Sequence, residues 1–249
     1  MANTPKTFTR DDGASIAYHK TEGDGPGVIF LGGFMSDMDG TKAIALEAHC
    51  QKQGRAYLRF DYQGHGHSSG EFKEGTIGKW AADAIAAIDA LTDGPQILVG
   101  SSMGGWIMLL AALARPERVT GLVGIAAAPD FTEALMWKGF STEIQETLQR
   151  DRVYYAPSEY GDQPYAITMD LIEDGREHLL LEDPIAIKCP VHLFQGIVDD
   201  AVPWEHALTI SRRLETDDVT TTFIKDGDHR LSREEDLAKI FAAVDRLAR

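Results

Sequence analysis

Short apolar runs alternate with stretches of helical periodicity along most of the chain. Residues 27–31 form a continuous apolar run, which is typical of a strand buried on both faces. Residues 77–91 instead carry apolar side chains at steps of three and four, the spacing of an amphipathic helix. This alternation of strand and helix predicts a parallel sheet with crossover helices. Further strands are predicted at residues 14–20, 55–60, 96–99, 119–127, 191–194 and 219–224, and further helices at 41–53, 103–114, 204–214 and 232–247.

The alternation is interrupted between residues 131 and 183. Helical spacing occurs there at residues 141–150 and again near 165–172, and the residues between them are rich in Tyr, Pro and Gly. We therefore predict one doubly wound α/β core, made of residues 1–130 and 184–249, into which residues 131–183 are inserted as a lid.

Aromatic residues are concentrated in the first part of this lid. Seven of the chain's 21 Phe, Trp and Tyr residues lie between residues 131 and 165. Ligand pockets are mostly apolar and aromatic, so these side chains are candidates for the wall of an acyl pocket. Trp137, Tyr154 and Tyr155 are the predicted substrate-binding residues, and docking of the lid onto the core is the alternative role for the aromatic side chains.

The chain is acidic, with 39 Asp and Glu against 24 Lys and Arg among 249 residues, which gives a net charge of −15. Nucleic acid and anionic membranes repel such a chain, so neither is expected as a partner. No apolar stretch approaches the roughly 18 residues of a membrane span. The first residues are polar and resemble neither a signal peptide nor an Arg-rich transit peptide, which predicts a cytoplasmic protein.

A G-x-S-x-G sequence at residues 100–104 is the strongest chemical signal in the chain. It follows the predicted strand at 96–99 and opens the predicted helix at 103–114. In that context the turn holds the central serine in a strained conformation and points its hydroxyl outward at the positive end of a helix. Ser102 is therefore the predicted nucleophile, and a helix-capping serine is the alternative.

A serine hydroxyl needs a base to take its proton and an acid to orient that base. Where a strand–G-x-S-x-G–helix unit carries the nucleophile, the acid and then the histidine follow it along the chain. Of eight histidines, His229 lies in the loop between the last predicted strand and the last helix, at the same sheet edge as Ser102. Asp199, after the strand at 191–194, is the predicted acid. Asp200 and Asp130 are its alternatives.

The oxyanion that forms during acyl transfer needs two fixed N–H donors. One is expected to be the backbone N–H of Met103, which follows the nucleophile. The other is expected from the glycine-rich turn after the strand at 27–31, where Phe34 is the predicted donor.

Cofactor and metal signals are weak. Residues 64–70 contain Gly-His-Gly-His but lack the G-x-G-x-x-G spacing of a dinucleotide site. His65 and His67 have no third zinc ligand nearby. Cys50 and Cys189 are too few for a disulfide framework or a Cys-based zinc site and are predicted to be buried thiols. We therefore predict no metal and no cofactor.

These motifs together resemble the serine α/β-hydrolases. The resemblance is closer to one branch, a group of mitochondrial α/β-hydrolase-domain proteins that act as acyl-protein thioesterases and acyl-glucuronide esterases. It implies an α/β-hydrolase fold with an eight-stranded, mostly parallel sheet, and it implies Ser102 as nucleophile, Asp199 as acid and His229 as base. The segments that carry it are residues 39–43, 59–62, 93–106, 199–204 and 228–230.

The expected function is hydrolysis of carboxylic esters or thioesters through an acyl-enzyme, with a small molecule or an acylated molecule as substrate. A cofactor-free perhydrolase or carbon–carbon bond hydrolase with the same three residues is an alternative. A ligand receptor on a hydrolase scaffold is the alternative that is not an enzyme. The protein is expected to be a monomer or a homodimer.

Overall fold

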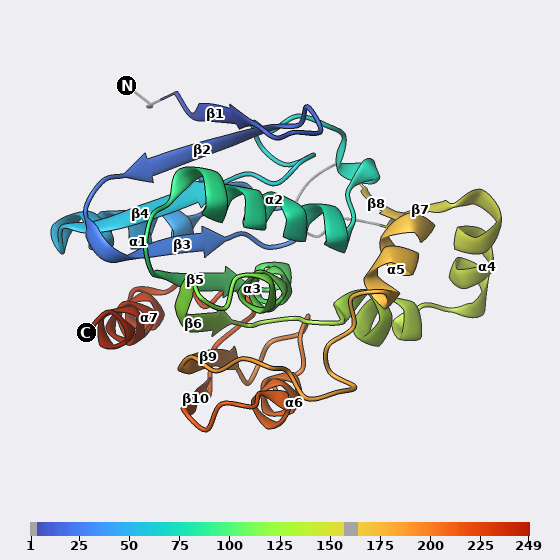
Figure 1. The fold of residues 1–249 in the computed structure, drawn as a ribbon. Coiled ribbons are helices and arrows are strands. Elements are labelled where there is room, and N and C mark those ends of the chain that lie inside the picture. Colours follow the sequence, from blue (N-terminus) through green and yellow to red (C-terminus); the bar gives the residue numbers. More distant parts are fainter. Residues whose placement is uncertain (1–3, 157–163) are drawn as a thin grey trace.

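The computed structural model describes residues 4–156 and 164–249, and a single eight-stranded sheet runs through its centre (Figure 1). The strands are ordered β1-β2-β4-β3-β5-β6-β9-β10. The first two pairings, β1 with β2 and β2 with β4, are antiparallel, and all later pairings are parallel. The strands are β1 (Lys6–Thr9), β2 (Ser15–Thr21), β3 (Asp24–Leu31), β4 (Arg55–Phe60), β5 (Gln96–Ser101), β6 (Val119–Ile125), β9 (Val191–Gly196) and β10 (Val219–Ile224).

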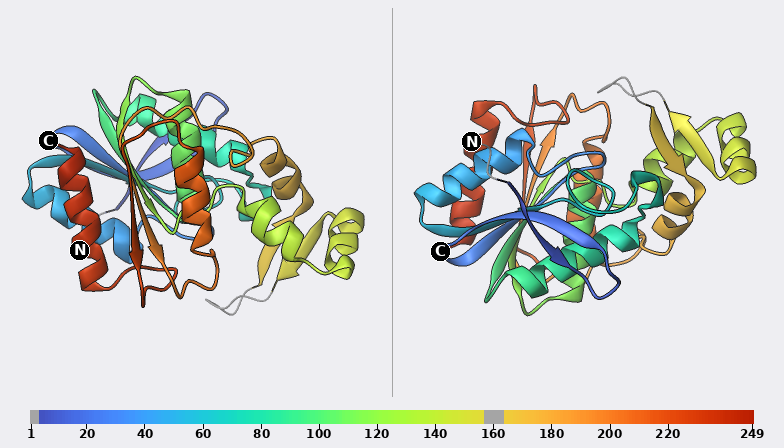
Figure 2. Two further views of the ribbon diagram at one scale, coloured as in Figure 1. Left: turned by 90° about the horizontal axis from the view of Figure 1, so that it is seen from below. Right: turned by 90° about the horizontal axis from the view of Figure 1, so that it is seen from above.

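Helices cover both faces of the sheet because its central strands are apolar on both faces. On β3, Val28 and Phe30 pack with α1 and α7, whereas Ile29 and Leu31 pack with α2 and α3 on the other face. Figure 2 shows the two helix layers from below and from above the view of Figure 1. The helices are α1 (Thr41–Lys52), α2 (Ile77–Leu91), α3 (Met103–Ala114), α6 (Glu205–Arg213) and α7 (Glu234–Leu247).

The predicted doubly wound, mostly parallel sheet of eight strands is confirmed. The helices predicted at 77–91 and 103–114 begin and end at the predicted residues. The helix predicted near 165–172 is wrong in its first half. Residues 165–168 form a strand, β8, and the helix α5 (Met169–Arg176) begins only after Thr168, whose hydroxyl accepts a hydrogen bond from the N–H of Leu171.

The segment predicted as a lid leaves the sheet after β6 and returns to it before β9 (Figure 1). It contains one turn of π-helix at 132–136, a short 3-10 turn at 137–139, α4 (Thr142–Asp151) and a hairpin of β7 (Val153–Ala156) with β8 (Tyr165–Thr168). Residues 157–163 of this segment lie outside the described residues. The segment has an apolar core of its own, made of Leu148, Ile167, Met169 and Ile172.

One buried carboxylate joins the two ends of this segment. Asp130, at its start, accepts hydrogen bonds from the backbone N–H groups of Leu180 and Leu181, at its end, both at 2.8 Å. Asp130 has a φ of +61°, a backbone conformation that is uncommon outside glycine and asparagine-like residues. The carboxylate therefore fixes where the chain leaves the sheet layer and where it returns.

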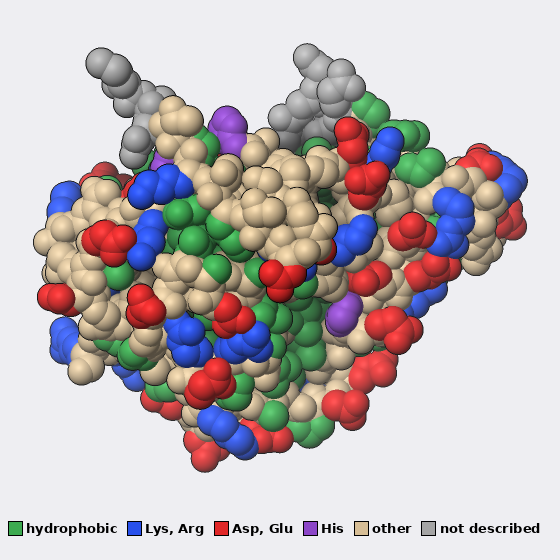
Figure 3. All heavy atoms as spheres, turned by 45° about the horizontal axis from the view of Figure 1, so that its top comes forward, with side chains coloured by type: hydrophobic (Ala, Val, Ile, Leu, Met, Phe, Trp, Pro, Cys, Tyr) green, Lys and Arg blue, Asp and Glu red, His purple; other side chains and the backbone are tan. Residues whose placement is uncertain are grey.

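The surface carries charges of both signs. Figure 3 shows acidic and basic side chains interspersed over one face of the molecule, with apolar side chains exposed between them. Both cysteines are free thiols in the structure. Cys50 is buried, and burial raises its pKa to about 12.

No helix in the described ranges is both long and apolar enough to pass through a lipid bilayer.

Replacing Asp130 by Ala should lower the free energy of unfolding by about 2–4 kcal/mol, because two backbone N–H groups lose their acceptor. Urea denaturation followed by circular dichroism measures this loss. The matched control is Asp200→Ala, since Asp200 is an exposed aspartate in another loop of the same sheet edge and its loss should change stability by less than about 0.5 kcal/mol. Equal stability of the two variants would contradict the role given to Asp130.

Candidate active site

Ser102 occupies the sharp turn between β5 and α3. Its backbone has φ of +55° and ψ of −120°, a strained conformation for a residue with a side chain. Hydrogen bonds from both sides hold it there. The N–H of Ser102 donates to the carbonyl of Ile125 at 2.9 Å, and its own carbonyl accepts from the N–H groups of Gly105 at 2.8 Å and Ala128 at 3.0 Å.

The two outer glycines of the G-x-S-x-G sequence allow this turn to exist. A Cβ atom at Gly100 would overlap the carbonyl oxygen of Gly104, and a Cβ atom at Gly104 would overlap the carbonyl oxygen of Leu31 in β3. The start of α3 therefore lies directly against the ends of β5 and β3. This close approach pushes Ser102 out at the carboxyl edge of the sheet.

His229 and Asp199 lie beside Ser102. The Nε2 atom of His229 is 3.0 Å from the Ser102 hydroxyl, and its Nδ1 atom is 2.9 and 3.1 Å from the two carboxylate oxygens of Asp199. An ionised carboxylate can only accept, so Nδ1 carries the proton and Nε2 is the acceptor for the Ser102 hydroxyl. Three residues that are 30 and 127 positions apart in sequence thus form one hydrogen-bonded chain.

The Asp199 side chain is fully buried. Burial raises the pKa of this carboxyl group, but the hydrogen bonds from His229 and from the N–H groups of Val202 and Ala201 outweigh it and hold the pKa below its ordinary value. The side-chain amide of Gln195 donates a further bond at 2.9 Å. Asp199 is therefore ionised at neutral pH and fixed in orientation.

The two alternative acids are placed elsewhere. Asp200 is exposed to solvent, although it lies within the same turn as Asp199. The carboxylate of Asp130 is occupied by the N–H groups of residues 180 and 181. Two other histidines make structural contacts, because Nε2 of His192 lies 2.9 Å from the Thr222 hydroxyl and Nε2 of His206 lies 2.8 Å from the carbonyl of Pro129.

The two predicted oxyanion donors lie at the same place. Phe34 and Met103 both line the cavity that contains Ser102 and His229. Met103 is the first residue of α3, so its N–H is among those with no acceptor inside the helix. The turn that carries Phe34 runs close to Ser102, since a Cβ atom at Gly33 would lie 3.5 Å from the Cβ of Ser102.

Asp61, to which the sequence analysis assigned no role, holds the chain just beyond that turn in place. One carboxylate oxygen of Asp61 accepts from the N–H of Met38 at 2.7 Å, and the other accepts from the N–H of His67 at 2.8 Å. A Cβ atom at Gly66 would overlap the same carboxylate. The Gly-His-Gly-His stretch thus supports the site by packing around the buried carboxylate of Asp61. The position of Asp61 directly after β4 was the sequence signal that could have indicated this role.

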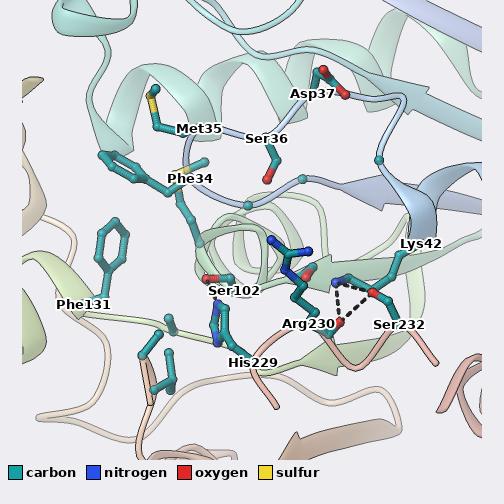
Figure 4. Close-up of a pocket in the computed structure, with 18 of the residues that line it drawn as sticks. Phe34, Met35, Ser36, Asp37, Lys42, Ser102, Phe131, His229, Arg230 and Ser232 are labelled. Atoms are coloured by element: carbon teal, nitrogen blue, oxygen red, sulfur yellow. Dashed lines mark hydrogen bonds between the residues drawn. The ribbon is translucent and has the colours of Figure 1, made fainter. Parts of the chain in front are cut away.

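The cavity beside Ser102 has a volume of about 610 Å³ and two chemically different ends (Figure 4). In the close-up, Phe34 and Phe131 lie on one side of Ser102, and Lys42, Arg230 and Ser232 lie on the other. The apolar end is lined by Phe34, Phe131, Leu135, Met136, Tyr165 and Ile167. The polar end is lined by Ser36, Asp37, Thr41, Lys42, Arg230 and Ser232.

The lid residues that line this cavity differ from the predicted ones. Of the described residues, those lining it do not include Trp137, Tyr154 or Tyr155. The Trp137 ring stacks under a guanidinium group of α5, Tyr154 packs against Phe140 within the lid, and Tyr155 is 58% exposed on β7. The aromatic residues of the segment therefore divide, with Trp137, Phe140 and Tyr154 packed against the small core of the lid and Phe131 and Tyr165 lining the cavity. The hairpin turns its other strand, β8, towards the cavity.

No group of three or more His, Cys, Asp or Glu side chains within residues 4–156 and 164–249 is placed to hold a metal ion. The absence of a cofactor stays a prediction, as does the monomeric or homodimeric state.

Comparison with known proteins gives consistent matches. The family model described as "alpha/beta hydrolase fold" matches residues 26–164. The human protein "Palmitoyl-protein thioesterase ABHD10, mitochondrial" is 41% identical over 241 residues, which are 96% of this chain and 78% of that protein, and the mouse protein of the same name is 40% identical. The solved structure of mouse alpha/beta hydrolase domain-containing protein 10 superposes with a TM-score of 0.90 at 38% identity, over 98% of both chains.

A bacterial structure is equally similar. A putative hydrolase from Agrobacterium vitis superposes with a TM-score of 0.93 at 38% identity, over 99% of this chain and 100% of that one.

The prediction of a cytoplasmic protein is wrong by this comparison, because the human and mouse relatives are both named as mitochondrial. It rested on the polar first residues of the chain. A cell compartment is set by targeting signals, and the packing of a hydrolase core does not record it.

Replacing Gly104 by Ala should lower the free energy of unfolding by more than about 3 kcal/mol, since the backbone of Leu31 and Gly32 blocks the added methyl group. Thermal unfolding measures the loss. Gly139→Ala is the matched control, because a Cβ atom there meets nothing within 4 Å. If both variants melt at the temperature of the parent protein, the close approach of α3 to β3 is not the constraint described above.

Proposed function

We propose that this chain, which belongs to the α/β hydrolase family, cleaves carboxylic esters or thioesters with Ser102 as nucleophile, His229 as base and Asp199 as orienting acid. The observation that carries the proposal is the continuous hydrogen-bonded chain from Asp199 through the imidazole to the Ser102 hydroxyl, with distances of 2.9 and 3.0 Å. A serine that only caps a helix, or a ligand receptor, has no need of this row of hydrogen bonds.

The first half of the reaction forms an acyl-enzyme. The Ser102 oxygen attacks the substrate carbonyl carbon while its proton passes to Nε2 of His229. The carbonyl oxygen becomes an oxyanion, which the N–H groups of Met103 and Phe34 are proposed to bind. His229 then gives the proton to the departing alkoxide or thiolate as its bond to the acyl carbon breaks, and an alcohol or thiol is released.

The second half releases the acid. Water attacks the acyl carbon and gives a proton to His229, and the Ser102 oxygen leaves with that proton. In both halves the imidazole becomes an imidazolium, whose charge the buried carboxylate of Asp199 stabilises. This contribution is large because the carboxylate is ionised, fully buried and held by backbone N–H groups.

The two ends of the cavity support different roles. The apolar end suits the acyl group, because its wall of Phe131, Leu135 and Met136 offers little to a polar chain. The polar end suits the leaving group, with Ser36, Asp37 and Thr41 as the side chains proposed to contact it. Relatives named palmitoyl-protein thioesterases support a long-chain acyl thioester as the substrate class, and the acyl group would then extend from Ser102 towards the lid.

Ser102→Ala should lower turnover by about 10⁴- to 10⁶-fold, since the three residues act as a unit. Asp199→Asn should cost about 10³- to 10⁴-fold, because the amide favours the wrong imidazole tautomer. Hydrolysis of p-nitrophenyl butyrate and covalent labelling by a fluorophosphonate, detected by intact mass, measure both effects.

Asp200→Asn is the control for Asp199 and should leave both readouts unchanged. Labelling at another residue, or full turnover by Ser102→Ala, would rule out the assignment. Peroxide-dependent halogenation or cleavage of a dienoic diketone at rates above ester hydrolysis would instead favour a perhydrolase or carbon–carbon hydrolase.

Filling the apolar end should shorten the preferred acyl chain. Leu135→Trp is expected to lower kcat/KM for dodecanoyl and hexadecanoyl p-nitrophenyl esters and thioesters at least tenfold, while acetyl esters change by less than about twofold, because loss of pocket volume penalises only long chains. A panel of chain lengths, run beside an acyl glucuronide, measures the change. Tyr155→Trp, on the exposed face of β7, is the control. An unchanged chain-length profile in Leu135→Trp would place the acyl group elsewhere.

A further inference from the structure

Lys42 reaches from α1 across the polar end of the cavity to the loop that carries His229. Its ammonium group donates a hydrogen bond of 2.5 Å to the carbonyl oxygen of Arg230, the residue after His229. The Ser232 hydroxyl donates to the same carbonyl at 3.0 Å and lies 3.5 Å from the ammonium. Figure 4 shows this cluster next to Ser102 and His229.

The loop between β10 and α7 is strained at this place. Leu231 has a φ of +45°, unusual for a branched side chain. The side chain of Asp228 holds the loop from within by accepting from the N–H groups of Arg230 at 3.1 Å and Leu231 at 3.0 Å. The carbonyl of Arg230 points the other way, towards α1, and there Lys42 binds it.

The position of Lys42 is unfavourable in two ways. It lies in the first turn of α1, where a positive charge opposes the helix dipole, and that turn contains no acidic side chain. The side chain is also half-buried, which costs part of the hydration of the ammonium. These costs are offset by the charge-assisted hydrogen bond to the loop, a type about twice as strong as a neutral one.

We propose that Lys42 is a positioning residue, which fixes the His229 loop through the Arg230 carbonyl so that Nε2 stays within hydrogen-bond distance of the Ser102 hydroxyl. The inference rests on the proposed function and goes beyond it, because it assigns a role to a residue outside the three that take part in the reaction. It predicts that Lys42 affects the chemical step and leaves substrate affinity nearly unchanged.

The charge of Lys42 gives the proposal a specific signature in the pH dependence of turnover. Burial lowers the pKa of Lys42 to about 8, with the Asp228 carboxylate acting against this and the Arg230 guanidinium adding to it. Asp37 and His229 line the same cavity. Above pH 8 the ammonium becomes a neutral amine and its hydrogen bond to the carbonyl weakens. Turnover should therefore decline as pH rises through about 8.

Lys42→Met should lower kcat for p-nitrophenyl butyrate by about tenfold, because a small misplacement of the base is costly, with KM within twofold. The rate of fluorophosphonate labelling at Ser102 should fall by the same factor, and the decline above pH 8 should disappear. Lys42→Arg should restore most of kcat without that decline, since a guanidinium stays charged. Lys52→Met, in the exposed last turn of the same helix, is the control.

An unchanged kcat, labelling rate and pH profile in Lys42→Met would overturn the proposal. So would a raised KM with unchanged kcat, which would make Lys42 a substrate-binding residue. If Lys42→Met fails to fold, the pH profiles of the parent protein and of Lys42→Arg decide, and identical profiles overturn the proposal. Failure of the proposed function is recognised separately, because the parent protein would then not be labelled at Ser102.

Discussion

The contact between the first turn of α3 and the ends of β3 and β5 is the constraint on which the rest of the site depends. Backbone meets backbone there, and only glycine at positions 100 and 104 leaves enough room. The contact forces Ser102 into a positive φ and aims its hydroxyl out of the sheet edge. The strain is held by the large apolar core on both faces of the sheet, which includes the whole buried side of α3.

Buried carboxylates shape the loops around this point. Asp61, Asp130 and Asp199 each lie after a strand of the parallel sheet, and each accepts hydrogen bonds from two backbone N–H groups. The donors come from two separate loops for Asp61, from the end of the lid segment for Asp130, and from its own turn for Asp199. Burial raises the pKa of Asp61 and Asp130, because their backbone partners do not fully replace water. Asp199 differs in having His229 as a further partner, and its pKa is lowered. The pKa of a buried aspartate that binds two backbone N–H groups is therefore raised without an imidazole partner and lowered with one.

The lid and the core contribute unlike surfaces to one cavity. The lid and the Phe34 turn provide the apolar end, whereas α1 and the loop of His229 provide the polar end. Ser102 lies at the boundary (Figure 4). A substrate of the proposed class, which joins an apolar acyl group to a polar leaving group, would match both ends at once, with its carbonyl at Ser102. The fixed attachment of the lid through Asp130 keeps the apolar wall in register with that boundary.

The layered sheet could be predicted from the order of residues, because hydrophobic periodicity reports which side chains are buried. The place of Ser102 in a sharp turn between a strand and a helix could be predicted as well, because a G-x-S-x-G spacing there is typical of such a turn. Three aspartates could be predicted as candidates for the orienting acid, and only the folded chain shows that Asp199, and not Asp200 or Asp130, contacts His229. Neighbouring residues of a turn point in different directions, and distant chain segments decide which of them is buried.

The same limit applies to the lid. The strand at 165–168 and the cavity residues Leu135 and Ile167 depend on strand pairing and on packing across the fold. Such contacts join residues that no local pattern connects.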